Sequence, residues 1–271
     1  MMVTAVQARI IGLLRFSVLT PTYYSEKFDS LDKTAAHIFD DDRLALRFRI
    51  FETLCLPSLT RQSDSGFDMV ILTGEAMPAH WLGRLRALVD PWPNIHLRPV
   101  GTENHYRLLQ DGYDSIPTEG MTHRILFRLD DDDALDIDFV ARTRRLAQGL
   151  LALQGPDIPF VIAHNRGFYV RATTDGNEVF DARERAPLST GTTLVARLGH
   201  GPNPYRFVHR KLAQHYNTYS DISVPAFIRT IHGDNKSTPT QMGITHKMKP
   251  PEIDRQLRAH FGVTLDQMKA L

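Results

Sequence analysis

The stretch RILFRLDDDDAL, residues 124–135, places four consecutive aspartates directly after a short apolar run. A short apolar run bounded by polar residues is typical of a buried strand. Neighbouring carboxylates repel one another, and the repulsion grows as water is withdrawn from them. A bound cation would remove that cost, whereas a solvated loop would avoid it. The stretch therefore predicts a buried strand that ends at a cation site or in a solvated acidic loop.

The first half of the chain alternates between strand and helix patterns. Apolar runs predict strands at 15–20, 67–74, 94–101, 123–130 and 159–165, and the last of these continues into GFYVRAT as a hairpin. Helical spacing of apolar residues predicts helices over 41–59, 78–90 and 136–153. This alternation is typical of a mostly parallel sheet with helices on both faces. We therefore predict an α/β fold, in which the less regular second half completes the same domain.

Composition narrows the class of protein. The 271 residues are 42% hydrophobic and 23% charged, which is ordinary for a globular chain with a buried core. A net charge of +1 gives no case for nucleic-acid binding. The single cysteine, Cys55, lies in an apolar helical pattern, so we expect a buried thiol. One cysteine also excludes a disulfide scaffold and a thiolate zinc site.

The sequence offers no clear targeting signal. Arg9 and Arg15 interrupt the N-terminal apolar segment, which makes it a poor signal peptide. No stretch approaches the roughly 18 apolar residues of a membrane span. We expect a cytoplasmic protein, and peripheral attachment to a membrane through exposed basic residues stays open.

In open α/β sheets, ligands bind beyond the carboxyl ends of the strands. This rule places four segments around one crevice, namely residues 20–23, 73–75, 101–103 and 130–133. The aspartate run then lies where a ligand is expected.

Four motifs, taken in order, resemble a known family. They are GLLRFSVL (12–19), LPSLTRQ (56–62), FRLDDDDAL (127–135) and RTIHGDNKS (229–237). Together they resemble a family of bacterial rhamnosyltransferases, which are family 2-like glycosyltransferases of the GT-A fold with an Asp-x-Asp motif. The resemblance covers residues 12–240. It implies a single GT-A-like domain over 1–271, with a nucleotide-binding half at 12–130, an acceptor-side half at 131–245 and a helical tail at 246–271.

A glycosyltransferase of this kind needs to stabilise a departing diphosphate, and a divalent cation does so as a Lewis acid. Mn²⁺ and Mg²⁺ favour oxygen ligands, often one or two carboxylates together with phosphate and water. Alternate residues of a strand face the same side, so Asp130 and Asp132 could act together. The resemblance implies metal ligands at Asp132, Asp130 and His232. The alternatives are that Asp133 or Asp136 caps the following helix, and that His232 is an ordinary surface or core histidine.

The resemblance also implies residues that contact the donor nucleotide: Thr20, Pro21, Tyr23, Glu75, Arg128, Asp130 and Asp131. The ring of Tyr23 would stack on the base, or it packs inside the protein. Glu75 stands where relatives hold the base or ribose with an acidic residue. Arg128 binds phosphate, or it pairs with a neighbouring aspartate.

An inverting transferase also needs a base for the acceptor hydroxyl. The acidic pair that family 2-like enzymes carry before a helix is absent. The available candidates are Asp181 and Asp221, followed by Glu184 and His209, and the alternative for each carboxylate is an ordinary surface charge.

The predicted activity is metal-dependent transfer of a sugar from a nucleoside-diphosphate donor to a glycan or lipid-linked saccharide. The resemblance points to rhamnose, with dTDP-rhamnose as the donor. Two other classes stay open: a metal-dependent phosphohydrolase or nucleotidyltransferase, and a non-catalytic sugar-binding module. The Asp-x-Asp-x-Thr pattern of haloacid dehalogenases and the calcium-loop pattern are both absent from the run.

Overall fold

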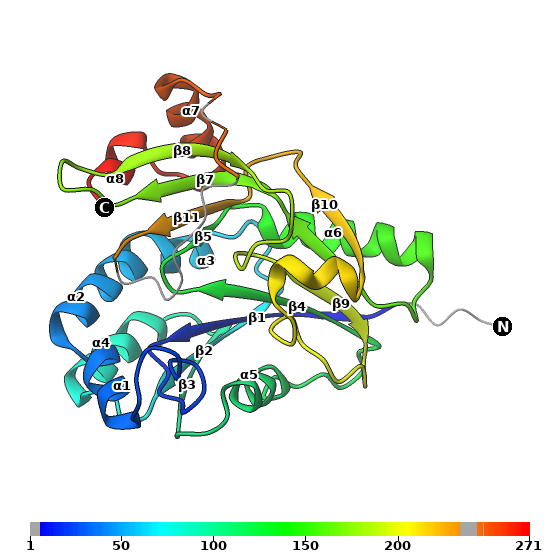
Figure 1. The fold of residues 1–271 in the computed structure, drawn as a ribbon. Helices are drawn as coiled ribbons and strands as arrows, with labels where there is room; N and C mark the ends of the chain where they lie inside the picture. The colour runs from blue at the N-terminus through cyan, green and yellow to red at the C-terminus, as the bar shows by residue number, and fades with distance from the viewer. Residues whose placement is uncertain (1–5, 234–242, 246) are drawn as a thin grey trace.

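The computed structural model describes residues 6–233, 243–245 and 247–271, which form two sheets with helices around them (Figure 1). Within these residues the larger sheet has seven strands in the order β10-β6-β9-β4-β1-β2-β3. The smaller sheet has the order β5-β11-β7-β8. The strands of the larger sheet are β1 (Ala8–Phe16), β2 (Asp68–Gly74), β3 (Ile95–Val100), β4 (His123–Asp130), β6 (Phe160–His164), β9 (Thr193–Arg197) and β10 (Asn217–Asp221). Those of the smaller sheet are β5 (Ala134–Leu135), β7 (Arg166–Arg171), β8 (Glu178–Arg183) and β11 (Phe227–Ile231).

The larger sheet is parallel except at β9, which runs antiparallel to both of its neighbours. The helices are α1 (Leu31–Ile38), α2 (Asp41–Ile50), α3 (Leu56–Thr60), α4 (Ala79–Val89), α5 (His105–Asp114), α6 (Phe139–Gln154), α7 (Pro250–Phe261) and α8 (Leu265–Lys269). A π-helical turn (Phe51–Cys55) joins α2 to α3, and a 3₁₀ helix (His209–Gln214) precedes β10. The predicted α/β fold with a mostly parallel sheet is therefore confirmed.

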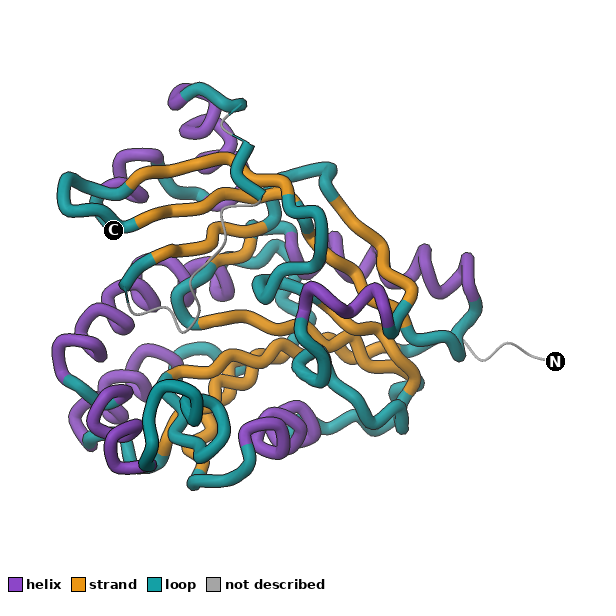
Figure 2. Tube along the Cα trace, in the orientation of Figure 1, coloured by secondary structure: helices purple, strands orange, loops and turns teal. Residues whose placement is uncertain are grey.

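Two apolar layers hold the larger sheet between helices. Side chains of α2, α3, α4 and α6 pack on one face, and α5 packs on the other. Cys55 is fully buried in the first layer, as predicted. A third apolar cluster joins α7 and α8 to the smaller sheet. Figure 2 shows the strands at the centre of the molecule and the helices around them.

Two predicted strands differ from the structure. The first strand ends at Phe16 rather than at residue 20, because Ser17 has a positive φ of 51° and turns the chain out of the sheet. The apolar Leu19 then packs against α1 instead of a neighbouring strand. The predicted hairpin after residue 165 is wrong. β7 leaves the larger sheet and pairs with β8 and β11, so β6 and β7 belong to different sheets.

The helix predicted over 41–59 forms as α2, the π-helical turn and α3 in succession. Asp40 caps its start, since its carboxylate accepts a hydrogen bond from the Arg43 N–H at 3.0 Å. This path carries α2 past the carboxyl ends of β1 and β4. In the described part of the chain, no helix has the length and apolarity needed to cross a membrane.

Candidate functional site

A charged pocket lies at the carboxyl ends of β1 and β4, where the sheet rule places a ligand. The space between its walls, open solvent at the mouth included, is about 730 Å³. It is lined by the aspartate run, by four arginines and by aromatic residues of the loop after β1: Arg15, Ser17, Val18, Tyr23, Tyr24, Arg43, Arg47, His105, Asp130, Asp131, Asp132, Asp133, Arg229 and Thr230. We call it the aspartate pocket.

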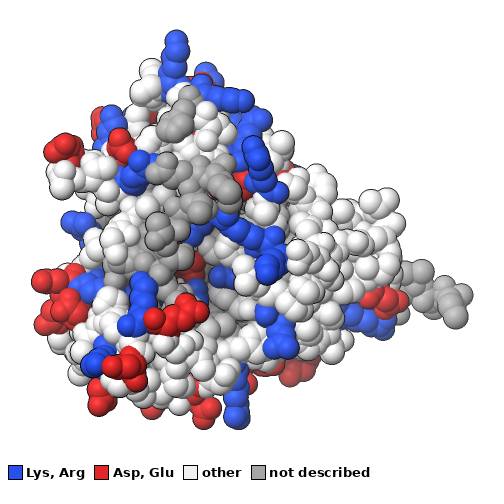
Figure 3. Space-filling view, in the orientation of Figure 1, with Lys and Arg blue, Asp and Glu red and all other residues white. Residues whose placement is uncertain are grey.

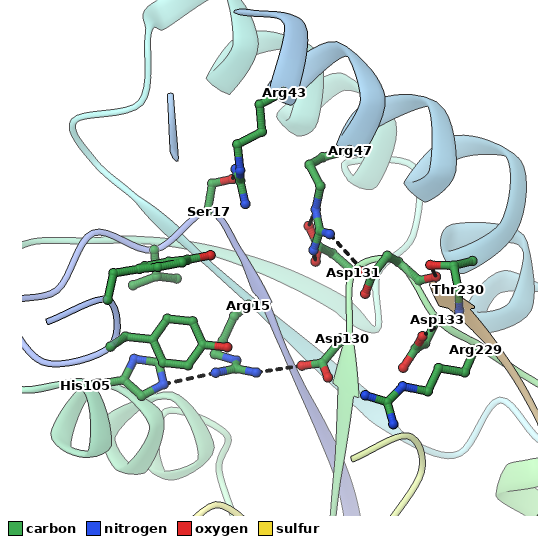
Figure 4. Close-up of a pocket in the computed structure, with 14 residues that line it drawn as sticks. Arg15, Ser17, Arg43, Arg47, His105, Asp130, Asp131, Asp133, Arg229 and Thr230 are labelled. Carbon is green, nitrogen blue, oxygen red and sulfur yellow. Dashed lines mark hydrogen bonds and ion pairs between the residues drawn. The ribbon is translucent and has the colours of Figure 1, made fainter. Parts of the chain in front are cut away.

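The first aspartate of the run is held by an arginine from the neighbouring strand. Asp130 accepts a hydrogen bond from Arg15 at 2.6 Å, and Arg15 lies 3.1 Å from the Nε2 of His105 (Figure 4). Burial raises the pKa of the Asp130 carboxyl, but Arg15 and Arg128 outweigh it, so this pKa lies below its usual range. Asp130 is therefore a permanent anion near neutral pH.

The second and third aspartates share one arginine from α2. The Arg47 Nε donates to Asp131 at 3.0 Å, its Nη2 donates to the other oxygen of Asp131, and its Nη1 donates to Asp132 at 2.8 Å. Burial raises the pKa of Asp131 in spite of Arg47. Burial also acts to raise the pKa of Asp132, but Arg47 and His232 outweigh it and lower this pKa.

The fourth aspartate ties the loop to the smaller sheet. Asp133 accepts hydrogen bonds from the Thr190 hydroxyl and from the Thr230 N–H at the pocket wall. Burial and the charge of Asp132 raise its pKa well above the usual range. Figure 4 shows Arg229 of β11 reaching toward Asp130 and Asp133. Asp133 thus links the aspartate run to the wall of the pocket through these two hydrogen bonds.

The alternative role, in which Asp133 or Asp136 is the N-cap of the following helix, does not apply. The N-cap position of α6 is Asp138, and its side chain makes no capping hydrogen bond. Asp136 pairs with Arg142 through both carboxylate oxygens, and its Oδ1 also accepts the Asp138 N–H at 3.1 Å. Asp133 is occupied by the two threonines described above.

Two of the three predicted metal ligands, Asp132 and His232, lie in contact, but the Arg47 Nη1 already donates to Asp132 Oδ2 at 2.8 Å and lies 3.3 Å from His232 Nε2. His232 lines a neighbouring pocket rather than the aspartate pocket itself. The Nε2 of His232 lies 2.9 Å from the Oδ2 of Asp132, a separation that two neighbouring ligands of one small cation would have. Asp130 instead faces Arg15. In the described part of the chain, no group of three histidine, cysteine or acidic residues could hold a metal ion. Phosphate oxygens and water would therefore have to supply the remaining ligands, as is usual for Mg²⁺.

The loop after β1 brings aromatic rings to the pocket. Tyr23 stacks on the His105 ring with centroids 4.4 Å apart, and the guanidinium of Arg15 lies 4.6 Å from the Tyr23 centroid. Thr20 is buried, and its hydroxyl accepts a hydrogen bond from the Tyr23 N–H at 3.0 Å. Ser17 accepts a hydrogen bond from Arg43 at 2.9 Å, so its left-handed backbone is fixed at the pocket.

Several predicted nucleotide contacts lie outside the aspartate pocket as the structure defines it. Thr20 does not line the pocket, but its hydroxyl holds the loop that carries Tyr23. Pro21 and Glu75 are exposed and do not line the pocket either. The guanidinium of Arg128 lies over the ring of Tyr205, 4.1 Å from its centroid. Among the described residues Arg128 forms no ion pair with an aspartate, although its charge contributes to the low pKa of Asp130.

The two first-choice bases also lie away from this pocket. Asp181 accepts hydrogen bonds from the Thr245 hydroxyl and from two backbone N–H groups, and it lines a different pocket. Asp221 accepts from both the N–H and the hydroxyl of Ser223, and it lies 3.6 Å from His164. The structure therefore does not bring either carboxylate to the aspartate run.

The other two candidate bases are similarly committed. Glu184 is buried and accepts a hydrogen bond from the Tyr169 hydroxyl at 2.6 Å. His209 has its Nδ1 2.6 Å from the Pro187 carbonyl oxygen, and burial with the nearby Arg128 lowers its pKa to about 4.

The sequence analysis did not identify the basic residues of the pocket. Arg43 and Arg47 are four positions apart on α2 and share one face of the helix. The helix prediction used only the apolar positions of this segment, so these arginines were left out. Arg15 lies inside the GLLRF motif and Arg229 inside RTIHG, so both were within quoted motifs without an assigned role.

Two solved structures illustrate which known proteins resemble this chain. Among solved structures, S. aureus TarS 1–349 in complex with UDP-GlcNAc has a TM-score of 0.44 and 11% identity, covering 93% of this chain and 65% of that one. A "Putative Glucose-1-Phosphate Thymidylyltransferase" from Bacillus anthracis has a TM-score of 0.35 and 9% identity, covering 78% of this chain and 87% of that one. This chain thus spans just under two thirds of TarS 1–349.

Sequence comparison gives the family. No curated protein sequence matches the chain. The model of the family described as "Putative rhamnosyl transferase" matches residues 9–244, a range that contains both β1 and the aspartate run. Because this match covers most of the chain, the protein belongs to the rhamnosyl transferase family, a family of glycosyltransferases.

Proposed function

We propose that the protein transfers rhamnose from a nucleoside-diphosphate donor, dTDP-rhamnose, to a hydroxyl of a glycan or lipid-linked saccharide, with Mn²⁺ or Mg²⁺ as cofactor. Membership of the family supports sugar transfer as the reaction class. The observation that carries the proposal is the contact of Asp132 with His232 at 2.9 Å, beside the arginines of the aspartate pocket. A divalent cation bound to both residues would take the place that the Arg47 guanidinium holds between them.

The arginines of the pocket suit a diphosphate. A guanidinium donates two parallel hydrogen bonds to phosphate oxygens, and such charge-assisted bonds are about twice as strong as neutral ones. Arg43 reaches the pocket from α2 and Arg229 reaches it from β11, so they approach from different elements. Two such groups would orient the diphosphate and offset the charge that develops when the sugar leaves.

Asp132 and His232 would hold the cation, and Asp130 would keep Arg15 in place beside them. When bound, the cation supplies Lewis-acid stabilisation of the departing diphosphate. The remaining task of the chain is to position the donor. Tyr23, packed flat on His105, presents an aromatic surface at the edge of the pocket on which a base can stack.

Calorimetry of a nucleoside diphosphate with Mn²⁺ tests this proposal. We expect Asp132→Ala to abolish Mn²⁺-dependent binding of dTDP, because the variant loses a ligand that His232 alone cannot replace. Asp175→Ala is the matched control, since Asp175 is an exposed aspartate in the turn between β7 and β8. Circular dichroism would establish that both variants are folded. Unchanged Mn²⁺-dependent binding in folded Asp132→Ala would refute the assignment.

A further inference from the structure

The smaller sheet carries a second pocket. It is lined by residues of β7, β8 and the segment before α7, among them Arg166, Phe168, Asp181, Arg183, Lys247 and Met248. Phe168 and Met248 pack in the apolar cluster of α7 and α8. Arg229 is the register partner of Tyr169, so its side chain lies on the opposite face of the sheet from Phe168. The second pocket is therefore separate from the aspartate pocket.

Three basic residues line this pocket without a carboxylate partner. Arg166 and Arg183 are directly opposite one another in the antiparallel register of β7 and β8, and like charges in that position destabilise a sheet. Among the described residues, neither they nor Lys247 form a salt bridge. The pocket does contain Asp181, but its oxygens already accept hydrogen bonds from Thr245 and from backbone N–H groups of the same loop.

The guanidinium of Arg166 is only partly hydrogen-bonded within the described residues. Its Nη1 donates to the Ser223 carbonyl oxygen at 2.9 Å, whereas its Nε is buried and has no hydrogen-bond partner among the described residues. Burial and the charge of Arg183 lower the pKa of Arg166. The carboxylate of Glu252 acts in the opposite direction, but its oxygens accept hydrogen bonds from Arg255 and Gln256. Within the part of the chain that the structure describes, this half-buried guanidinium is therefore incompletely neutralised.

We propose that the second pocket binds a phosphate group through Arg166, Arg183 and Lys247. A phosphate offers several strong acceptor oxygens and would relieve the repulsion between the two arginines. In the space-filling view, Lys and Arg side chains gather on the upper part of the molecule, where α7 and the smaller sheet lie (Figure 3). The proposal goes beyond the proposed function and does not depend on a donor in the aspartate pocket.

Methionine methyl NMR gives a local readout, because Met248 lines this pocket and its resonance can be assigned with Met248→Leu. We expect inorganic phosphate to shift the Met248 resonance saturably, while sodium chloride at equal ionic strength does not. Arg183→Gln should weaken the fitted affinity by about 10-fold or more, the scale of one charge-assisted hydrogen bond. Lys211→Gln, an exposed lysine outside this pocket, should leave the affinity unchanged.

A second experiment distinguishes a free phosphate from the phosphate of a lipid headgroup. Co-sedimentation with phosphatidylglycerol vesicles, compared with phosphatidylcholine vesicles, tests a lipid headgroup in the same site. Phosphate binding or phosphatidylglycerol binding that Arg183→Gln weakens supports the pocket and tells the two sources apart. An unmoved Met248 resonance together with no such vesicle binding, or equal affinities for wild type and Arg183→Gln, would overturn it. Loss of dTDP binding at the aspartate pocket would leave this result unaffected, so the two proposals fail separately.

Discussion

Arg47 is the residue on which the charge balance of the aspartate pocket depends most. Its side chain is 10% exposed, and those of its partners Asp131 and Asp132 are 3% and 7% exposed. Replacing it by methionine keeps an unbranched side chain of similar length but removes the guanidinium that the two buried carboxylates share. Breaking a buried ion pair by removing one partner costs about 3–5 kcal/mol. We expect Arg47→Met to lower the free energy of unfolding by that amount.

Urea unfolding at pH 7 measures this cost, with Arg49→Met as the control. Arg49 is an exposed arginine on the same helix, so its replacement should change stability by less than about 0.5 kcal/mol. Adding Asp131→Asn to Arg47→Met removes one of the two carboxylate charges that Arg47 balances and should recover part of the loss. A loss below about 1 kcal/mol for Arg47→Met, the range of exposed ion pairs, would refute the reasoning.

The same variant has a predicted pH dependence. Burial already raises the pKa of Asp131 in the folded protein, and loss of Arg47 removes the main opposing charge. A group with a raised folded pKa stabilises the protein below its unfolded pKa, and this contribution is lost as pH rises through the folded pKa. The deficit of Arg47→Met should therefore shrink as the pH falls from 7 toward 4. A deficit that grows over this range would contradict the assignment.

Three further predictions follow from other contacts. Gly12→Ala should destabilise the protein by about 1–3 kcal/mol, because a Cβ there would lie 2.2 Å from the Phe127 ring. Gly149→Ala in α6 should be neutral or stabilising, because a Cβ there meets nothing within 4 Å among the described residues. Thermal unfolding compares the two variants. Asp221→Asn should cost about 1–3 kcal/mol at pH 7. Burial acts to raise the pKa of Asp221, but His164 and Ser223 outweigh it and lower this pKa. The cost of Asp221→Asn should therefore fade as the pH drops below about 4. Urea titrations at pH 7 and pH 3 should show a cost that does not grow in acid. His232→Gln should weaken Mn²⁺-dependent dTDP binding in calorimetry while leaving metal-free binding similar, and equal Mn²⁺ dependence in both proteins would count against a ligand role.

Much of the larger sheet could be predicted because its strands are short apolar runs with clear ends. The predicted strands at 67–74 and 123–130 closely match β2 and β4. In the smaller sheet, β8 was missed because it is rich in charged residues, and β10 at the edge of the larger sheet was missed because it is almost entirely polar. The first strand was placed too late because Val18 and Leu19 are apolar yet lie in the loop. The residue composition of a loop does not show which element it packs against.

The candidate site, like the fold, could be predicted only in part. The sequence indicated Asp130, Asp132, His232 and Tyr23, which the structure brings to one region. It did not indicate Arg47, because an ion pair between residues 84 positions apart leaves no local pattern. Asp181 and Asp221 were chosen as free carboxylates, although in the structure both are buried and hydrogen-bonded. Metal dependence, the division into halves and the cytoplasmic location stay predictions.

The most direct test of the central claim is a turnover assay with nucleotide sugars. Purified protein is incubated with Mn²⁺, a panel of donors that includes dTDP-rhamnose, and saccharide acceptors, and mass spectrometry follows both products. We predict release of the nucleoside diphosphate together with an acceptor heavier by one sugar, and a drop of about 10²–10³-fold in rate for Asp132→Ala, the scale of losing one preorganised electrostatic contact. The account would be contradicted if no nucleotide sugar turned over while simple phosphoesters released phosphate, because the aspartate pocket would then belong to a phosphohydrolase.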